Sequence, residues 1–508
     1  MFEYKGLEYS TEYVFTLSAN SISDLTDNAI AEAITVKFST KTKPAVTKAL
    51  YDFIVPDDGN FKEALEAAAA RPDKSQRFRI FVKRGAHLIP ANEANQVTGS
   101  DGKNYADPKT YFNTPNVSII GEGMEVTSVA NTMPNDLASN PDAGAGGQAN
   151  PLEGIRSSGL LYLQSGAINT YFEDITLKTN TPDATGRNVI LVDGGNKTIC
   201  KDVCLWAYQD TYVSDNGNAL NYFEGGIIRG RTDFICGSGD VFFNGVDIVM
   251  CEQGGYIVAP RNNVKYGYVF KDCTIKGEKA SVNGNYFLGR PWTEAAETYY
   301  IDCVMEAQPT AAGWTNMSAG GCTRFAEYNS ISATGSTIDL SGRVKELGKE
   351  TVNSFNPVLS AVEAAEIGDM RNMFGDWDPT EATEQASAPS NVVIENSVIT
   401  WDNSDYVLLW AICKDGKVID FTTQPTYTVN DATATYAVRA ANEMGGLGEA
   451  TVAVDAASIE GLIAGQAVLS VQIFNANGMQ QNKLQQGINI VRKTYANGAV
   501  TIEKKMVK

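Results

Sequence analysis

Short segments in which apolar and polar residues alternate dominate the middle of the chain. A period of two is typical of β-strands with one buried face. Six segments share an apolar pair, a polar or small pair and further alternation: "YFEDITL" (171–177), "ICKDVCL" (199–205), "YFEGGII" (222–228), "FFNGVDI" (242–248), "VFKDCTI" (269–275) and "YIDCVM" (300–305). They recur at irregular intervals of roughly 20 to 30 residues, with one strong strand in each unit.

This repeat favours a parallel β-helix, whose coils vary in loop length. A helical solenoid would show helical periodicity within each unit, and a propeller would need four strands per unit. An ordinary β-sandwich with similar strands is the alternative that the pattern leaves open. The clearest helix is predicted at 60–76, where Ala and Leu recur at helical spacing before Pro72. We therefore predict an all-β protein with a β-helix over residues 44–378.

The segments on either side of the central region also alternate and predict small β modules. Residues 1–43 predict two strands around a turn and resemble the last strands of a bacterial Ig-like domain. A polar linker, 379–390, precedes residues 391–456, which resemble a fibronectin III-like β-sandwich. The tail, 457–508, alternates again and resembles the C-terminal sorting modules of secreted Bacteroidetes proteins. Small β-sandwich-like modules attached to a β-helix are typical of multimodular polysaccharide-degrading proteins.

Length and charge narrow the class of protein. A chain of 508 residues is too long for one core, so we expect several domains. No apolar run is long enough to span a membrane. Lys and Arg number 41 against 60 Asp and Glu, a net charge of -19. This acidic balance without a basic block argues against nucleic-acid binding. An anionic substrate would therefore need a local patch of basic residues at its binding site.

Cysteine and histidine usage excludes several chemistries. None of the eight cysteines forms a C-x-x-C pair, so we predict small buried residues and no metal site. An oxidising compartment is permitted by this pattern. His87 is the one histidine, which excludes a zinc site with two histidine ligands. A Ser-His-Asp triad would need His87 itself, for which we predict a structural role.

Two aspartates stand in unusually apolar segments, "AYQDTYVSD" and "RGRTDFICG". Asp210 and Asp233 are 23 residues apart, about one coil of the predicted β-helix. The alternative for either residue is a turn aspartate that caps its own backbone. Equivalent positions on successive coils stack about 4.8 Å apart, so the two carboxyl groups can meet on one face. One of them should then keep its proton, which suits nucleophilic hydrolysis without histidine.

Three motifs strengthen this hypothesis. "YQDTYVSD", "RTDFICGSGDVFFN" and "YFLGRPW" resemble the QDT, DFxxG and LGRPW motifs of pectin methylesterases, the carbohydrate esterases of family 8, in family order and spacing. The resemblance extends from about Phe53 to about Trp377. Each motif alone is weak, and together they are specific. The resemblance implies a right-handed parallel β-helix that hydrolyses the C6 methyl esters of homogalacturonan to pectate and methanol.

The resemblance also implies a role for each matching residue. Asp233 would be the nucleophile, and Asp210 would protonate the departing methanol and then deprotonate the hydrolytic water. Gln209 would donate a hydrogen bond to the oxyanion. Arg290 would hold Asp233 ionised and aimed. The residues expected to bind substrate are Trp292 as a sugar-facing wall, Tyr208, Arg187 and Asn188. No cofactor and no metal are implied.

The chain departs from the family pattern at three places. A second oxyanion glutamine is usual about 22 residues before the QDT motif, but this chain reads "TGRNVILVDGGNKTI" there. Arg187 or Asn188 is the expected substitute. The segment "GAHLIP" lacks the glutamate of the family's early motif, and Cys236 stands where phenylalanine is usual. These changes affect rate and substrate detail more than the reaction class.

Rival functions share the β-helix fold. A polygalacturonase would need paired acids in "NTD" and "DD" arrangements, and a pectate lyase would need a cluster of acidic calcium ligands. Neither is apparent in the sequence. A non-catalytic polysaccharide-binding β-helix is the third rival, and the retained motif residues argue against it. We expect a monomer that acts on methyl-esterified homogalacturonan and is secreted, periplasmic or on the cell surface, although no signal segment is present.

Overall fold

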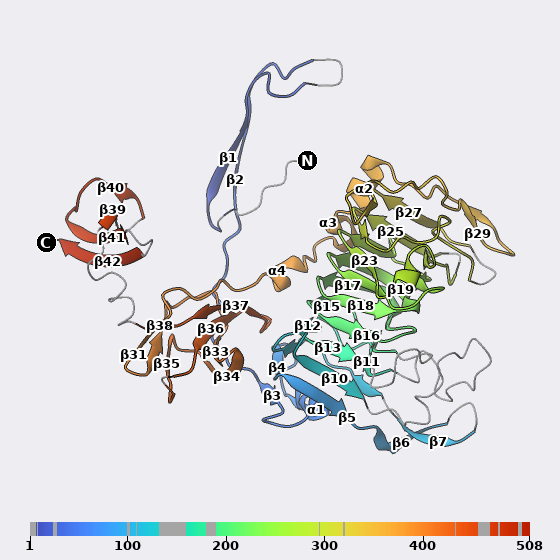
Figure 1. The fold of residues 1–508 in the computed structure, drawn as a ribbon, viewed down its shortest axis with the longest axis horizontal. Helices are drawn as coiled ribbons and strands as arrows, with labels where there is room; N and C mark the ends of the chain where they lie inside the picture. Colours follow the sequence, from blue (N-terminus) through green and yellow to red (C-terminus); the bar gives the residue numbers. More distant parts are fainter. Residues whose placement is uncertain are drawn as a thin grey trace.

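The centre of the molecule is a stack of short parallel strands (Figure 1). The structure is a computed structural model, and it describes residues 7, 9–23, 28–98, 102–107, 109–131, 159–178, 189–293, 295–317, 321–431, 433–455, 468–475, 478–495 and 500–507. Parallel pairing runs from coil to coil, as in a β-helix, and small antiparallel sheets are attached to the stack. The predicted fold class is therefore confirmed.

Two parallel sheets form the walls of the stack. The nine-stranded sheet contains β5 (Gly85–Ile89), β10 (Thr127–Asn131), β13 (Thr176–Lys178), β16 (Cys204–Trp206), β18 (Ile227–Gly230), β20 (Asp247–Met250), β23 (Thr274–Gly277), β26 (Val304–Met305) and β28 (Ile331–Ser332). The main path of the fifteen-stranded sheet contains β3 (Phe53–Val55), β4 (Phe78–Val82), β9 (Val117–Gly121), β12 (Tyr171–Glu173), β15 (Ile199–Lys201), β17 (Tyr212–Glu224), β19 (Thr232–Asn244), β22 (Tyr268–Lys271), β25 (Glu297–Ile301) and β27 (Arg324–Tyr328).

A third wall branches from the two long strands, β17 and β19. Its other members are β8 (Thr110–Phe112), β11 (Leu161–Leu163), β14 (Leu191–Asp193), β21 (Tyr256–Pro260) and β24 (Phe287–Gly289). The first part of β17 pairs with β14 and its last part pairs with β15, so the strand bends from one wall into the next. We call this branch the pocket wall, because the candidate site lies on it.

Apolar positions of the sequence repeat face the inside of the coils. Phe223, Phe243, Phe270 and Tyr300 occupy one column of the ladder. Successive ring centroids are 5.1, 4.5 and 4.5 Å apart, and the rings are stacked. The four side chains are buried inside the stack. Offset stacking at this spacing adds to the free energy gained by burying the rings.

The polar or small pair of each repeat turns the chain from one wall to the next. Asp174, Asp202, Asp272 and Asp302 all have φ between 47° and 56°. Gly225 stands at the matching corner with φ 60°. Aspartate, asparagine and glycine are the residues that adopt this left-handed conformation at low cost. The corners therefore explain why acidic and small residues recur in an otherwise apolar pattern.

Cysteine and histidine in this region have structural surroundings. Cys273 and Cys303 lie on neighbouring coils, because β23 pairs with β26 directly after them. All eight cysteines are buried. His87 lies on β5, and one of its ring nitrogens is 2.8 Å from the carbonyl oxygen of Lys83, which agrees with a structural role.

A short helix closes the first end of the stack. Helix α1 (Phe61–Ala70) begins with a capping box in which Asn60 and Glu63 exchange hydrogen bonds with each other's backbone. Its buried side chains, which include Phe61 and Leu65, belong to the same core as the coils. The helix ends before Pro72, so it is shorter than the predicted range of 60–76.

Further short elements border the coils. They are β6 (Asn92–Thr98), β7 (Asn104–Asp107), the 3-10 helix η1 (Ala280–Val282), β29 (Glu346–Leu347), β30 (Asn353–Ser354), α2 (Ala361–Ile367) and α3 (Met370–Phe374). Helix α4 (Thr380–Thr383) lies in the segment predicted as a linker. There the Lys201 ammonium donates to the Thr383 carbonyl oxygen at 2.6 Å, so this segment packs on the stack.

A β-sandwich follows α4. One sheet contains β31 (Val393–Glu395), β32 (Val398–Thr400), β35 (Thr426–Thr428) and β38 (Val454–Asp455), and the other contains β33 (Trp410–Lys414), β34 (Lys417–Thr422), β36 (Tyr436–Ala441) and β37 (Leu447–Val452). Trp401 and Trp410 lie in its core with ring centroids 5.7 Å apart. The domain boundaries of the sequence stay a prediction.

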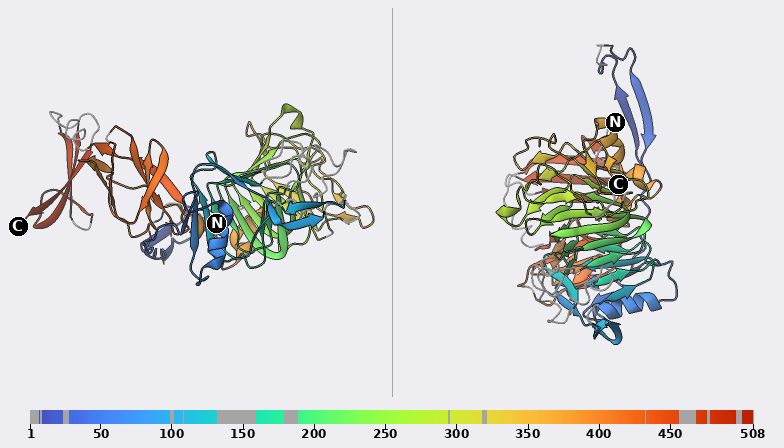
Figure 2. Two further views of the ribbon diagram at one scale, coloured as in Figure 1. Left: turned by 90° about the horizontal axis from the view of Figure 1, so that it is seen from below. Right: turned by 90° about the vertical axis from the view of Figure 1, so that its right-hand side faces the viewer.

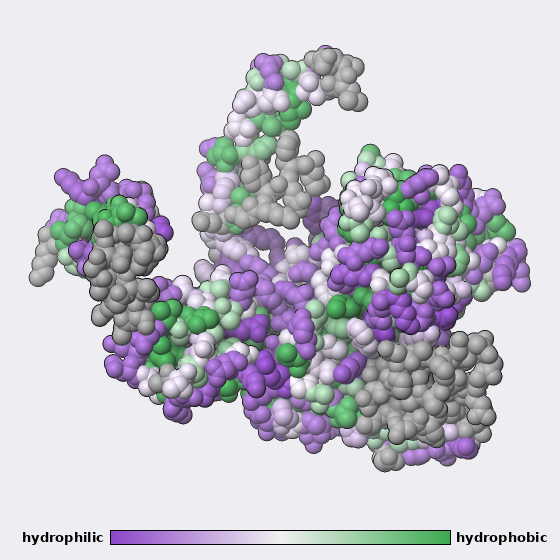
Figure 3. Space-filling model, in the orientation of Figure 1, coloured by the Kyte–Doolittle hydropathy of each residue, from purple (hydrophilic) through white to green (hydrophobic). Residues whose placement is uncertain are grey.

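Two small sheets stand away from these bodies (Figures 1 and 2). Strands β1 (Glu12–Leu17) and β2 (Ile34–Ser39) form an antiparallel hairpin, as expected for residues 1–43. The C-terminal sheet contains β39 (Val468–Asn475), β40 (Gln480–Gln481), β41 (Gly487–Tyr495) and β42 (Val500–Val507). Both expose apolar side chains, among them Val36 and Ile502 (Figure 3). The Ig-like and sorting-module interpretations stay predictions.

Candidate active site

Asp210 and Asp233 occupy equivalent places on successive coils. Gln209 forms a bridge with Thr232, and the Asp210 amide donates to the Thr232 carbonyl oxygen at 3.2 Å. Tyr212 then pairs with Ile235, which keeps the same offset of 23 residues. Both aspartates have a left-handed backbone, with φ of 55° and 48°. The spacing that drew attention in the sequence is therefore one step of the ladder.

Arg290 binds Asp233 with both arms of its guanidinium group. Its Nε donates to Oδ1 at 2.8 Å, and its Nη2 donates to Oδ2 at 2.6 Å. The guanidinium also lies 3.8 Å from the centroid of the Tyr256 ring. Arg290 comes directly after β24, where its amide donates to the Val258 carbonyl oxygen on the neighbouring coil. A fork of two hydrogen bonds fixes the direction of the carboxylate as well as its charge.

The ion pair stabilises the charged form of Arg290. Burial disfavours the charged guanidinium, but the hydrogen bonds and the negative charge of Asp233 outweigh this effect and raise the pKa of Arg290. The charge of Asp210 acts in the same direction, and so does Tyr256. Asp210 and Asp233 are each 4% exposed, so this charge cluster is nearly removed from water.

A small pocket of about 160 Å³ brings the predicted residues together. It is lined by Gln209, Asp210, Asp233, Cys236, Ala259, Trp292 and Met317. Its floor belongs to a buried apolar cluster on the pocket wall that contains Val189, Val192, Val213, Cys236 and Ala259. Trp292 and Met317 pack against this cluster. The two carboxyl groups thus border an apolar surface on which a sugar ring can lie.

Three pocket residues were not predicted from the sequence. The Cys236 thiol donates to Asp210 Oδ1 at 3.9 Å, a contact that the family's usual phenylalanine could not make. Ala259 and Met317 come from later coils, and no motif marks them. Cys236 could have been found, because it lies three residues after Asp233 on the same strand. Met317 lies 84 residues after Asp233, so only the folded chain reveals it.

Trp292 also supports a second cation. The guanidinium of Arg261 lies 4.7 Å from the centroid of the Trp292 ring. Arg261 Nε donates to the Ser238 hydroxyl oxygen at 2.7 Å, and Nη2 donates to Asp215 at 3.3 Å. The side chain of Arg261 is still about a third exposed. It therefore places a partly exposed guanidinium group, paired with Asp215, beside the pocket.

The remaining predicted residues lie elsewhere or outside the described residues. Tyr208 is buried, the Arg231 guanidinium lies 5.8 Å from its ring centroid, and it does not line the pocket. Its contact with substrate stays a prediction. Arg187 and Asn188 lie outside the residues that the structure describes, so the second oxyanion donor stays a prediction as well. Val189, which follows them, is buried in the apolar cluster that contains Cys236 and Ala259.

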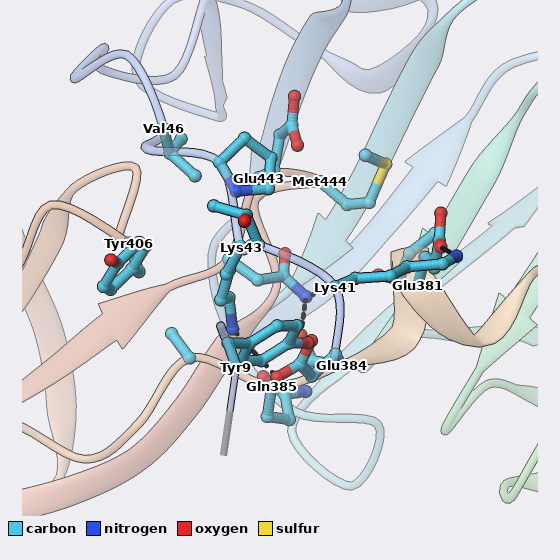
Figure 4. A pocket seen from close by; sticks show the side chains of 15 residues that line it. Tyr9, Lys41, Lys43, Val46, Glu381, Glu384, Gln385, Tyr406, Glu443 and Met444 are labelled. Carbon is cyan, nitrogen blue, oxygen red and sulfur yellow. Dashed lines mark hydrogen bonds and ion pairs between the residues drawn. The ribbon is translucent and has the colours of Figure 1, made fainter. Parts of the chain in front are cut away.

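Two further features of the described residues bear on function. A larger cavity lies between the segment before β3 and the sandwich (Figure 4). Lys41 pairs there with Glu381, and Lys43 and Tyr9 both bind Glu384. Within the described ranges, no group of three His, Cys, Asp or Glu side chains could hold a metal ion. No helix among these residues is long and apolar enough to cross a membrane.

The model of the family described as Pectinesterase matches residues 151–363. Pectinesterase 1 of Solanum lycopersicum is 24% identical over 58% of this chain and 50% of its own length. Pectinesterase A of Emericella nidulans is 29% identical over 35% of this chain and 56% of its own. The chain thus spans about half the length of the curated relatives it matches.

Solved pectin methylesterases are similar in structure. The enzyme from carrot is 20% identical with a TM-score of 0.48, and the match covers 69% of this chain and 99% of that one. PemA from Erwinia chrysanthemi is 21% identical with a TM-score of 0.47, over 65% and 99%. Asp210, Asp233 and Arg290 all lie inside the family match. The Pectinesterase family model therefore matches the part of this chain that carries the candidate site.

Proposed function

We propose that this protein hydrolyses the C6 methyl esters of homogalacturonan, releasing pectate and methanol. The observation that carries the proposal is the two-armed hydrogen bond from Arg290 to Asp233, beside Asp210 in one pocket. Arg290 keeps Asp233 an anion and directs its oxygen atoms. Nucleophilic attack by a carboxylate needs both conditions.

The reaction takes place in two halves. An Asp233 oxygen attacks the ester carbonyl carbon, and the side-chain amide of Gln209 donates to the oxyanion that forms. The carbon–methoxy bond then breaks, Asp210 gives its proton to the departing methoxide, and an anhydride joins the substrate to Asp233. In the second half Asp210 takes a proton from water, which attacks the anhydride carbonyl carbon. Galacturonate is released, and Asp233 is again a carboxylate.

The surroundings of the pocket suit a polymer of galacturonate. Trp292 offers a flat apolar surface to a sugar ring. The guanidinium group of Arg261 lies against the indole ring of Trp292. The partly exposed guanidinium group of Arg261, which is also bound by Asp215, is a cation beside the pocket that a negatively charged galacturonate can contact. A cell-wall polysaccharide as substrate implies a secreted, periplasmic or cell-surface protein, which we propose together with the activity.

Methanol release from esterified pectin by the purified chain tests the proposal. We expect Asp233→Asn to lower the turnover number at least about 10³-fold, because an amide is a poor nucleophile. Asp210→Asn should also be severely impaired, since an amide neither protonates methoxide nor accepts a proton from water. Asp272→Asn is the matched control. It is an aspartate with φ 55° at a coil corner away from the pocket.

The products separate this proposal from its rivals. A lyase would release unsaturated uronides, and a polygalacturonase would release reducing ends without methanol. A binding protein would release neither. If folded Asp233→Asn keeps the parent rate of methanol release, the proposed nucleophile is wrong. If the parent chain releases no methanol, the proposed function itself is wrong.

A further inference from the structure

An ion pair between the buried Arg229 and the partly exposed Glu278 lies next to the segment that carries Gln209 and Asp210, outside the pocket. Arg229 on β18 is 3% exposed. Its Nε donates to Glu278 Oε1 at 2.5 Å, and its Nη2 donates to Glu278 Oε2 at 2.8 Å. Glu278 directly follows β23, two coils further along the stack. The fork joins residues 49 positions apart.

The same arginine also binds the segment that carries the pair. Its Nη1 donates to the Ala207 carbonyl oxygen at 3.0 Å, and its guanidinium lies 4.4 Å from the centroid of the Trp206 ring. The Arg229 carbonyl oxygen accepts from the Thr211 hydroxyl at 2.9 Å. Arg229 thus contacts both ends of the segment 206–211. Gln209 and Asp210 lie between these two attachment points.

This segment has a conformational reason to need support. Aspartate adopts the left-handed backbone of Asp210 more readily than most residues do, and contacts with the surrounding segment help to hold it there. Immediately before it, Gln209 has to present its amide to an oxyanion, and small errors in such placement reduce rates strongly. A buried two-armed arginine is suited to this task, because its planar fork holds Glu278 and a carbonyl oxygen in fixed directions.

We propose that Arg229 and Glu278 form a brace that positions Gln209 and Asp210 for the reaction. The kinetic consequence of the brace rests on the proposed function, and the brace itself rests on the hydrogen bonds described above. Arg229 is a positioning residue, since it acts through the segment 206–211. Glu278 anchors it from a different coil, so the geometry of the acid depends on a residue 68 positions further along the chain.

Two substitutions test the brace. Arg229→Lys keeps the charge but loses the fork, and Glu278→Gln keeps the shape of the acceptor at a less buried position. We expect the turnover number on esterified pectin to fall about 10- to 100-fold in Arg229→Lys and by a smaller factor in Glu278→Gln. The KM should change by less than about two-fold, because the substrate-binding surface is unaltered.

The chain offers a closely matched control. Arg343 is also buried and binds a carboxylate with two arms, Glu327, at 2.6 and 3.3 Å. It also donates to the carbonyl oxygens of Thr310 and Ala311. Arg343→Lys therefore removes the same kind of buried fork without touching the segment 206–211. We expect it to lower the unfolding temperature while the turnover number of the folded protein stays near the parent value.

Amide hydrogen exchange of the peptide covering 206–211 gives a readout that does not depend on activity. We expect faster exchange there in Arg229→Lys and in Glu278→Gln, but not in Arg343→Lys. The brace is overturned if both folded variants keep the parent exchange rate and turnover number, or if Arg343→Lys matches them in both measurements. If Arg229→Lys does not fold, Glu278→Gln decides alone. A parent chain inactive on pectin contradicts the proposed function, and exchange still decides the brace.

Discussion

The catalytic hypothesis depends on the conformation of two single residues. Asp210 and Asp233 both adopt positive φ, which turns their side chains away from the regular alternation of a strand. The sequence could predict this pair, because both residues interrupt apolar patterns at a spacing of one coil. It could not predict that Arg261 would lie on Trp292, since the two residues belong to different loops and no pattern relates them.

Arg290 is the residue whose replacement tests the charge arrangement most directly. Arg290→Lys retains a positive charge but supplies one point charge in place of two directed hydrogen bonds. We expect kcat/KM for methanol release to fall about 10- to 100-fold, because Asp233 loses its fixed direction. Initial rates on esterified pectin provide the measurement. A lysine variant as active as the parent would show that the charge suffices and that the fork has no role.

At the scale of elements, the coil explains which predictions succeeded. The strands of the repeat could be predicted because one side of each faces a dry interior, whereas the left-handed corners at Asp and Gly became apparent only in the structure. The pocket could be predicted only in part. Cys236 and Ala259 are paired on neighbouring strands. They form one surface only because of the strand register, and neither sequence segment alone indicates this.

The aromatic column inside the coils should be a main source of stability. Phe243 stacks on Phe223 and Phe270 and is completely buried. Phe243→Ala should lower the free energy of unfolding by about 3–5 kcal/mol, the usual result of truncating a buried aromatic ring. Calorimetry of the β-helix transition measures this loss, with the exposed Val264→Ala as control. Equal unfolding temperatures for both variants would contradict a dominant role of the column.

At the scale of the whole molecule, buried acids join the β-helix to the segment that leads into the sandwich. The Tyr171 hydroxyl donates to Glu173 at 2.7 Å, and the amide of Gln385 donates to the same carboxyl group. Burial raises the pKa of Glu173 to about 7, although the nearby Lys201 opposes this effect. Burial also raises the pKa of the neighbouring Asp174 to about 6.

These shifts predict that the assembly loses stability as the pH rises. Between the usual pKa of a glutamate and about 7, the folded protein binds more protons than the unfolded chain, so the free energy of unfolding falls with increasing pH. Glu173→Gln should weaken this dependence, with a gain in stability over the parent that is larger at pH 8 than at pH 5. Denaturant unfolding at both values measures it. The exposed Glu306→Gln serves as control, and a gain of equal size at both values would contradict the prediction.

The ladder of backbone hydrogen bonds has a consequence for how this protein can vary. It acts as a ruler, because one rung of about 4.8 Å separates Asp210 from Asp233 regardless of the loops around them. Loops between the walls can therefore lengthen, shorten or exchange their residues while the spacing of the two reacting groups remains constant. The loops of a coil can therefore change the substrate preference, while the ladder of the same coil keeps the two reacting carboxyl groups at a constant spacing.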